Sequence, residues 1–195
     1  PLKFVGTAKG TVSNLKANID YLTFGNSGSL VGDVKIKGLP DIGSTFFDAD
    51  FKQLYASISD IDLLKIPNGT SVEPLVLPEQ VRTLGFVRFK GSFVGFLSDF
   101  VAYGSAETAL GVLKADINLK TPNDTLKYSG SLASKGFQLG KLLGAEPTVK
   151  KTAFDLEIDG KGSDVESMWL DAKGQVTSID VLGYKYKNVQ VDGLL

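Results

Sequence analysis

Alternation of apolar and polar residues at every second position is the feature that most limits what this chain can fold into. The pattern recurs over residues 29–38, 111–120, 151–162 and 183–195. In an extended strand successive side chains point to opposite faces, so a period of two gives each segment one apolar and one solvated face. Such segments are typical of antiparallel strands exposed to water on one side. The chain is therefore predicted to be all-β.

Turn-forming residues, such as those of 25–28, separate the alternating segments. We expect one continuous, mainly antiparallel sheet over residues 1–195, with a less regular insertion or loop at 59–84. Residues 51–64 also fit helical spacing. The predicted helices are short and lie at 60–66, 78–84 and 139–143. The predicted strands, roughly a dozen, lie near residues 2–12, 14–24, 29–38, 45–58, 86–97, 98–108, 111–120, 125–136, 151–162, 168–180 and 183–195.

The composition excludes most catalytic chemistry. The chain has no histidine and no cysteine, which removes Ser-His and Cys-His nucleophiles, thiolate chemistry and zinc sites built from these residues. Its 21 basic and 22 acidic residues leave a net charge of −1, and Arg82 and Arg88 are the only arginines, so nucleic-acid binding is disfavoured. No apolar run approaches the ~20 residues that span a bilayer. We expect no enzymatic activity, no metal and no cofactor.

Three acidic clusters could in principle bind a metal or take part in acid–base catalysis. They are Asp48 with Asp50, Asp60 with Asp62, and the acidic residues of 155–159. Each cluster alternates with apolar residues or flanks them, which favours carboxylates on the water side of a strand. We therefore expect solvated strand faces rather than sites.

Glycine occurs repeatedly inside the strand patterns, where it normally weakens a strand. This use predicts either a sheet that bends sharply through bulges and corners, or a face that something approaches closely. The glycines concerned fall on the apolar side of the pattern: Gly32, Gly91, Gly95, Gly130, Gly160, Gly174 and Gly193.

The apolar side of the strands is the chain's main candidate for a site. The sequence has no long amphipathic helix to cover it, so the sheet must fold on itself as a sandwich, barrel or half-pipe, or bury this side against a ligand. A sixteen-carbon acyl chain buried there gains roughly 10 kcal/mol before association costs. The predicted face comprises Phe4, Val12, Ile19, Val34, Ile36, Phe89, Phe93, Leu113, Ile117, Leu126, Tyr128, Leu132, Phe154, Leu156, Ile158, Leu170, Val176, Val189 and Val191.

Four stretches of the chain resemble a known family. The run from Leu84 to Gly104, followed by 108–119, is similar to the middle of TamB proteins from the Bacteroidetes, which belong to the AsmA-like envelope proteins. Residues 136–144 and 176–193 fit the same repeating β pattern, and the likeness extends over most of the chain. No catalytic signature is among these motifs.

The resemblance implies a fold, a place and a function. TamB proteins form a long curled β-sheet, an open half-pipe or β-taco with an apolar interior. They are anchored in the inner membrane, cross the periplasm and meet a TamA-like barrel at the outer membrane. The family is linked to phospholipid movement between the two membranes and to outer-membrane protein assembly. Because the anchor helix and the docking end are absent, we expect an internal segment whose apolar side shields phospholipid acyl chains.

Two other interpretations remain open at this stage. Exposed edge strands could act as a scaffold on which outer-membrane protein strands assemble by β-augmentation. A closed β-sandwich or barrel with a purely structural or adhesive role would instead fill its apolar side with its own side chains.

Overall fold

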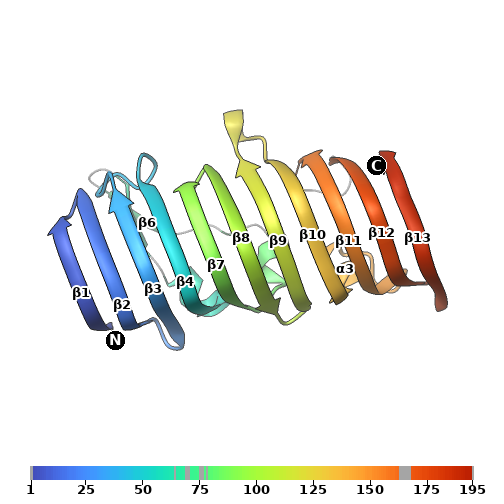
Figure 1. Ribbon diagram of the computed structural model, residues 1–195, viewed down its shortest axis with the longest axis horizontal. Helices are drawn as coiled ribbons and strands as arrows, with labels where there is room; N and C mark the ends of the chain where they lie inside the picture. Colours follow the sequence, from blue (N-terminus) through green and yellow to red (C-terminus); the bar gives the residue numbers. More distant parts are fainter. Residues whose placement is uncertain are drawn as a thin grey trace.

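The computed structural model describes residues 2–63, 65–68, 71–74, 77, 79–162 and 168–194. Eleven antiparallel strands form one sheet, ordered as they occur along the chain (Figure 1). A separate two-stranded hairpin interrupts the order between β4 and β7. The elements are β1 (Lys3–Thr11), β2 (Asn14–Phe24), β3 (Gly28–Lys37), β4 (Phe46–Ser57), α1 (Ile58–Asp62), β5 (Lys65–Asn68), β6 (Ser71–Pro74), α2 (Glu79–Arg82), β7 (Phe86–Phe96), β8 (Asp99–Thr108), β9 (Gly111–Lys120), the 3₁₀ turn η1 (Pro122–Asp124), β10 (Lys127–Gln138), α3 (Leu139–Leu142), β11 (Val149–Lys161), β12 (Trp169–Val181) and β13 (Tyr184–Leu194).

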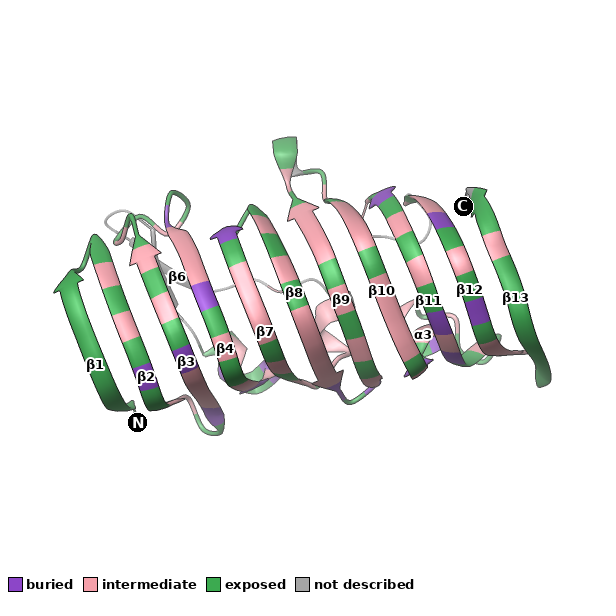
Figure 2. Cartoon of the chain, in the orientation of Figure 1, coloured by how far each residue is buried: buried purple, intermediate pink, exposed green. Residues whose placement is uncertain are grey.

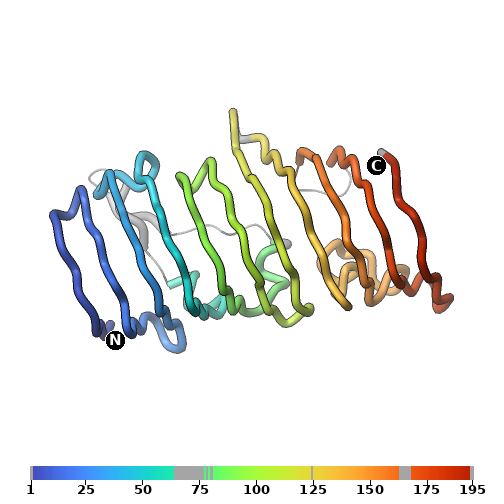
Figure 3. The backbone as a smooth tube through the Cα atoms, in the orientation of Figure 1, coloured from blue at the N-terminus to red at the C-terminus, as the bar shows by residue number. Residues whose placement is uncertain are grey.

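The sheet is long, curled and open. β1 and β13 lie at its opposite ends, so the described strands form a half-pipe rather than a closed barrel (Figure 3). Eleven strands at about 4.8 Å spacing give a length on the order of 50 Å. The all-β half-pipe fold expected for this chain is confirmed, and the closed barrel is excluded.

The eleven strands of the sheet agree with the predicted strands to within a few residues because the alternation of apolar and polar residues in the sequence marks them directly. The helical interpretation of 51–64 is wrong over its first half. Phe51 and Leu54 both lie in β4, and the register shift between them inserts one extra residue, which turns a spacing of two into a spacing of three. The helix predicted at 60–66 is also wrong in its second half, because α1 ends at Asp62 and β5 begins at Lys65.

The other two predicted helices are found in shortened form. α2 falls inside 78–84, of which Pro78 lies outside the described residues, and α3 falls inside 139–143. Of these short helices, α1 lies beside β4 and α3 lies beside β11. They cover little of the sheet.

The strand ends form two rims along the half-pipe. The upper rim, at the top of Figure 1, holds the β1–β2, β3–β4, β7–β8, β9–β10 and β11–β12 connections. The lower rim holds the β2–β3, β8–β9, β10–β11 and β12–β13 connections and α1, α2 and α3. The two rims therefore differ in how much structure is attached to them.

A hydrophobic cluster of buried residues lies toward the lower rim. Leu84, which precedes β7, and Leu142 of α3 pack against it. The cluster lies on the face of the sheet that carries Phe93, Ile117 and Ile158, which we call the inner face. The opposite face, which carries Val94 and Asn118, is the outer face. The fully or nearly buried members of the cluster are Leu110, Phe137, Phe154 and Val176.

Candidate functional site

Strand register gathers the predicted apolar residues on the inner face. Cross-strand partners point to the same side of a sheet, and the pairs run without interruption from β1 to β13. All but two of the predicted residues share this face: Phe4, Ile19, Val34, Ile36, Phe89, Phe93, Leu113, Ile117, Tyr128, Leu132, Phe154, Leu156, Ile158, Leu170, Val176, Val189 and Val191.

Two predicted residues lie outside the strands. Val12 sits in the β1–β2 turn, where its exposed fraction is 68%, because the strand ends one residue earlier at Thr11. Leu126 precedes β10, which begins at Lys127. The alternation continues through both positions in the sequence, but the backbone turns before it reaches Val12 and straightens only after Leu126.

Two rows of mostly small residues run along the middle of the inner face, from strand to strand. Glycine or alanine occupies most of their positions, and together we call them the small-residue rows. The first row is Ala8, Ala17, Val34, Ala49, Phe93, Ala102, Ile117, Gly130, Ile158, Ala172 and Gly193. The second is Gly6, Ile19, Gly32, Phe51, Gly91, Gly104, Ala115, Leu132, Leu156, Gly174 and Val191.

Rows of larger residues flank the small-residue rows on both sides. The row toward the upper rim includes Leu15, Ile36, Phe47, Phe100, Leu119, Tyr128 and Leu170. The row toward the lower rim includes Phe4, Leu22, Leu30, Leu54, Phe89, Phe154, Val176 and Val189. The inner face thus has a low floor between two higher walls, and its direction is that of the half-pipe axis.

Some glycines of the floor are required by the backbone itself. Gly91 has φ +150°, and a Cβ built on it would lie 2.0 Å from the Tyr103 carbonyl oxygen on β8. No other residue fits there without moving a neighbouring strand. At this position the close approach comes from the backbone of the neighbouring strand β8.

Aromatic rings interrupt the floor at β4 and β7. The Phe93 ring lies 4.6 Å from that of Phe100 and 6.4 Å from that of Phe47, and the Phe51 and Phe89 rings are 6.0 Å apart. These tilted and edge-on contacts are favourable geometries for aromatic pairs. They make β4, β7 and β8 the most aromatic part of the inner face.

The inner face is half-buried rather than filled. From β2 to β12, intermediate or buried inner positions alternate with more exposed outer ones, as the banding in Figure 2 shows, whereas β1 and nearly all of β13 are exposed. Phe93, Ile117 and Ile158 are all of intermediate exposure. A closed sandwich would bury such residues almost completely, so this apolar surface remains partly accessible to a ligand.

The acidic clusters divide into two kinds. Asp50 on β4 and the acidic residues of 155–159 on β11 are exposed on the outer face, as expected. Asp48, also on β4, is half-buried. The expectation is wrong for Asp60, which is fully buried. Within the part of the chain that the structure describes, no group of three or more acidic side chains could hold a metal ion.

Asp60 is a structural anchor at the lower rim. Its carboxylate accepts hydrogen bonds from the backbone N–H groups of Asn26 (2.6 Å) and Ser27 (3.2 Å) and from the hydroxyls of Ser27 and Ser57. These bonds, that from the Ser27 hydroxyl first, hold the pKa of Asp60 well below its usual range. Asp60 thereby ties α1 to the β2–β3 turn.

Comparisons of the chain with family models, with curated proteins and with solved structures find no match. None of the helices in the described residues is long and apolar enough to cross a membrane.

Proposed function

We propose that this chain is a lipid-binding segment of a conduit that shields phospholipid acyl chains in its half-pipe during transport between the inner and outer membranes. The observation that carries the proposal is the continuous apolar inner face, which extends across all eleven strands, is half-buried from β2 to β12 and is exposed on β1 and on nearly all of β13. A monomeric protein rarely leaves so large an apolar surface without a partner.

The floor and walls suit an extended, flexible ligand. Burial of a sixteen-carbon acyl chain contributes roughly 10 kcal/mol before association costs, at about 0.8 kcal/mol per methylene. The small-residue rows leave space for the chain, and the larger residues on either side supply contact area. Apart from the hydroxyls of Tyr128 and Ser134, the described rows offer no fixed polar group that would hold a lipid at one point. The lipid can therefore slide passively along the axis of the half-pipe.

The proposed setting is the bacterial periplasm, within a TamB-like protein of the AsmA-like class. The half-pipe fold supports this proposal, as do the sequence stretches that resemble the family. In this setting the anchor in the inner membrane and the contact with a TamA-like outer-membrane barrel belong to parts of the protein other than this segment.

Native mass spectrometry with lipid extraction tests the proposal. Phe93→Glu places a charge on the floor, whereas Val94→Glu places the same charge one residue along the strand on the outer face, where Val94 is already exposed. We expect phospholipid to copurify with the wild type and with Val94→Glu. In Phe93→Glu, occupancy falls by about tenfold or more because a buried charge is strongly disfavoured.

Two results would contradict the proposal. One is a wild-type protein that carries no lipid after purification and takes up none from micelles. The other is an equal loss in both variants, which would indicate a general effect of charge. Circular dichroism and the urea midpoint check that each variant folds. If Phe93→Glu does not fold, Ile158→Glu on β11 takes its place as the variant with a charge on the floor.

A second candidate is a scaffold for outer-membrane protein assembly, favoured by the two edge strands. Among the described residues β1 pairs with β2 and β13 pairs with β12, each on one side, and every residue of β1 is exposed. Unpaired edges are templates for β-augmentation. On this alternative, a peptide from an outer-membrane strand protects backbone amides of β1 or β13 from hydrogen exchange and leaves lipid occupancy unchanged. Protection confined to inner strands would oppose it.

A further inference from the structure

Three lysines stand side by side on the outer face at the upper rim. Lys120 ends β9, Lys127 begins β10 and Lys161 ends β11, and the register pairs Lys127 directly with both of the others. Directly opposite residues on neighbouring strands are about 5 Å apart, and like charges in such pairs are destabilising. The arrangement therefore favours a counter-charge that bridges the lysines.

The described part of the protein supplies this counter-charge only in part. Lys120 approaches Asp99 at 3.5 Å, with both side chains about half exposed. Lys127 and Lys161 form no ion pair with any residue that the structure describes. Asp159 lies in the next row, where it faces Asp171, so the three lysines with Asp99 and Asp159 carry a formal charge of +1.

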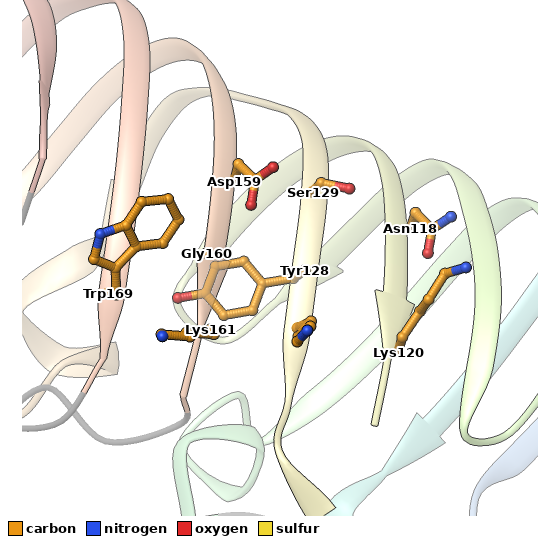
Figure 4. Close-up of a pocket in the computed structure, with 9 residues that line it drawn as sticks. Asn118, Lys120, Tyr128, Ser129, Asp159, Gly160, Lys161 and Trp169 are labelled. Atoms are coloured by element: carbon orange, nitrogen blue, oxygen red, sulfur yellow. The ribbon is translucent and has the colours of Figure 1, made fainter. Parts of the chain in front are cut away.

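A hollow of about 400 Å³ lies among these side chains (Figure 4). Besides the three lysines, its lining includes Ser129, Asn118, Trp169 and the acidic Asp159. Lysine ammonium groups, hydroxyls and amide N–H groups are the donors that bind phosphate oxygens. The hollow thus combines the charge and the donors that a phosphate group requires.

The hollow lies beside strand positions that belong to the wall of the inner face. Tyr128 and Gly160, which pair with each other in the row of larger residues nearest the upper rim, also line it. Figure 4 shows the Tyr128 ring extending across β11 at Gly160, where a Cβ would collide with the ring. Each of the three lysines is therefore one residue away, along its own strand, from a residue of the wall. A ligand with an apolar tail and an anionic head can contact both.

A second lysine row on the outer face provides a comparison. Lys9, Lys16 and Lys35 also pair directly and line a hollow of about 400 Å³. This row lies two residues further from the upper rim than the ends of β1 and β3, and Lys35 is held by Asp48 at 2.7 Å. It lies farther from the edge over which a lipid would pass.

We propose that Lys120, Lys127 and Lys161 form a headgroup subsite, which binds the phosphate of a phospholipid whose acyl chains lie on the inner face. This inference rests on the proposed function and adds the chemical class of the cargo: lipids with an anionic phosphate head, in preference to neutral lipids with the same tails. Ser129 donates a further hydrogen bond to the phosphate, and Trp169 borders the glycerol region.

Matched lipids and matched variants test the subsite. Phosphatidylglycerol and diacylglycerol with identical tails are titrated from micelles and followed by native mass spectrometry. The rim variant Lys127→Gln with Lys161→Gln is compared with Lys9→Gln with Lys16→Gln, which removes the same charge from the same face. We expect the wild type and the control to prefer phosphatidylglycerol by about tenfold or more, since charge-assisted hydrogen bonds are the strong ones. The rim variant loses this preference and keeps its affinity for diacylglycerol.

Each other outcome has a definite meaning. Equal wild-type affinity for both lipids overturns the subsite and leaves the proposed function intact. An equal loss in both double variants overturns it in favour of diffuse attraction. If neither lipid binds, the proposed function fails; glycerol 3-phosphate titrated by calorimetry then shows whether Lys127 and Lys161 bind a free phosphate instead, and no heat of binding overturns the subsite altogether.

Discussion

The two rims of the half-pipe are built differently, although the same strands end in both. At the lower rim Leu110 and Phe137 are fully buried under Leu84 and Leu142. At the upper rim Leu97, in the β7–β8 turn, has an exposed fraction of 44%. Burial of apolar area is the dominant stabilising term in folding, so the lower rim supplies a larger share of stability per residue.

This difference explains how an open sheet can persist. A lone sheet with one apolar face needs packing on that face to be stable. The half-pipe confines most of this packing to one side of the floor, where the short helices and the buried polar residues Asp60, Thr108 and Thr152 lie, while buried Thr45 lies at the opposite rim. The other side remains accessible, with lysines and exposed apolar residues along it. The lower rim thus supplies most of the stabilising packing, and the upper rim leaves the inner face accessible to a ligand.

The largest effect is expected from Phe137→Ala at the lower rim. Phe137 has an exposed fraction of 1% and packs in the main hydrophobic cluster. Truncation of a buried phenylalanine leaves a cavity and costs about 4 kcal/mol in the free energy of unfolding. Urea unfolding followed by circular dichroism measures the change. A cost below about 1 kcal/mol would mean that this cluster does not hold the half-pipe together.

Asp60→Asn is expected to cost about 2 kcal/mol, because the amide cannot accept all the hydrogen bonds that the buried carboxylate accepts. The pKa of Asp60 is lower in the folded protein than its ordinary value of 3.8. Its ionised form therefore stabilises the fold above that pH, and this contribution is lost as the pH falls below it toward the folded value.

The stability difference between wild type and Asp60→Asn should thus be constant near neutral pH and shrink below a pH of 3.8. Urea unfolding at a series of pH values measures it. A difference that does not change with pH would show that the carboxylate is not the stabilising group.

A third prediction compares two buried threonines near the lower rim. The Thr152 hydroxyl has no hydrogen-bond partner among the described residues, whereas the Thr108 hydroxyl donates to the Gly111 carbonyl and accepts from the Leu110 N–H. Thr152→Val is expected to leave stability unchanged or raise it by about 1 kcal/mol, and Thr108→Val to lower it by about 1 kcal/mol. Thermal unfolding of both variants checks the sign. The same loss in both would indicate that Thr152 has a partner in solution.

The sequence alone predicts the strands well, because alternation is a local signal written in each segment. It fails where the decisive contact is distant in the chain. Asp60 looks like a residue on a solvated face, and only the fold brings Asn26 and Ser27 against its carboxylate. Between Phe51 and Leu54, one bulge residue is enough to imitate helical spacing.

The sequence predicts which residues lie on the apolar face of the sheet. It does not predict that small residues line the middle of this face and larger residues flank them. Alternation assigns residues such as Ile117 and Ile158 to one side of their strands. Which residues stand in the same row depends on turn lengths and bulges, because each register shift moves a whole strand relative to its neighbour. The lysine cluster was missed for the same reason, since Lys120 and Lys161 are far apart in sequence and meet only through their common partner Lys127.

The smallest effect is expected from Leu97→Ser at the upper rim. Leu97 is exposed in a turn and lies outside the main cluster, so its replacement by a polar residue should change the free energy of unfolding by less than about 0.5 kcal/mol. Urea unfolding beside Phe137→Ala measures the contrast between the rims directly. A cost that grows with protein concentration would mean that the upper rim is covered by a second copy in solution, and the half-pipe would then be closed by association rather than open.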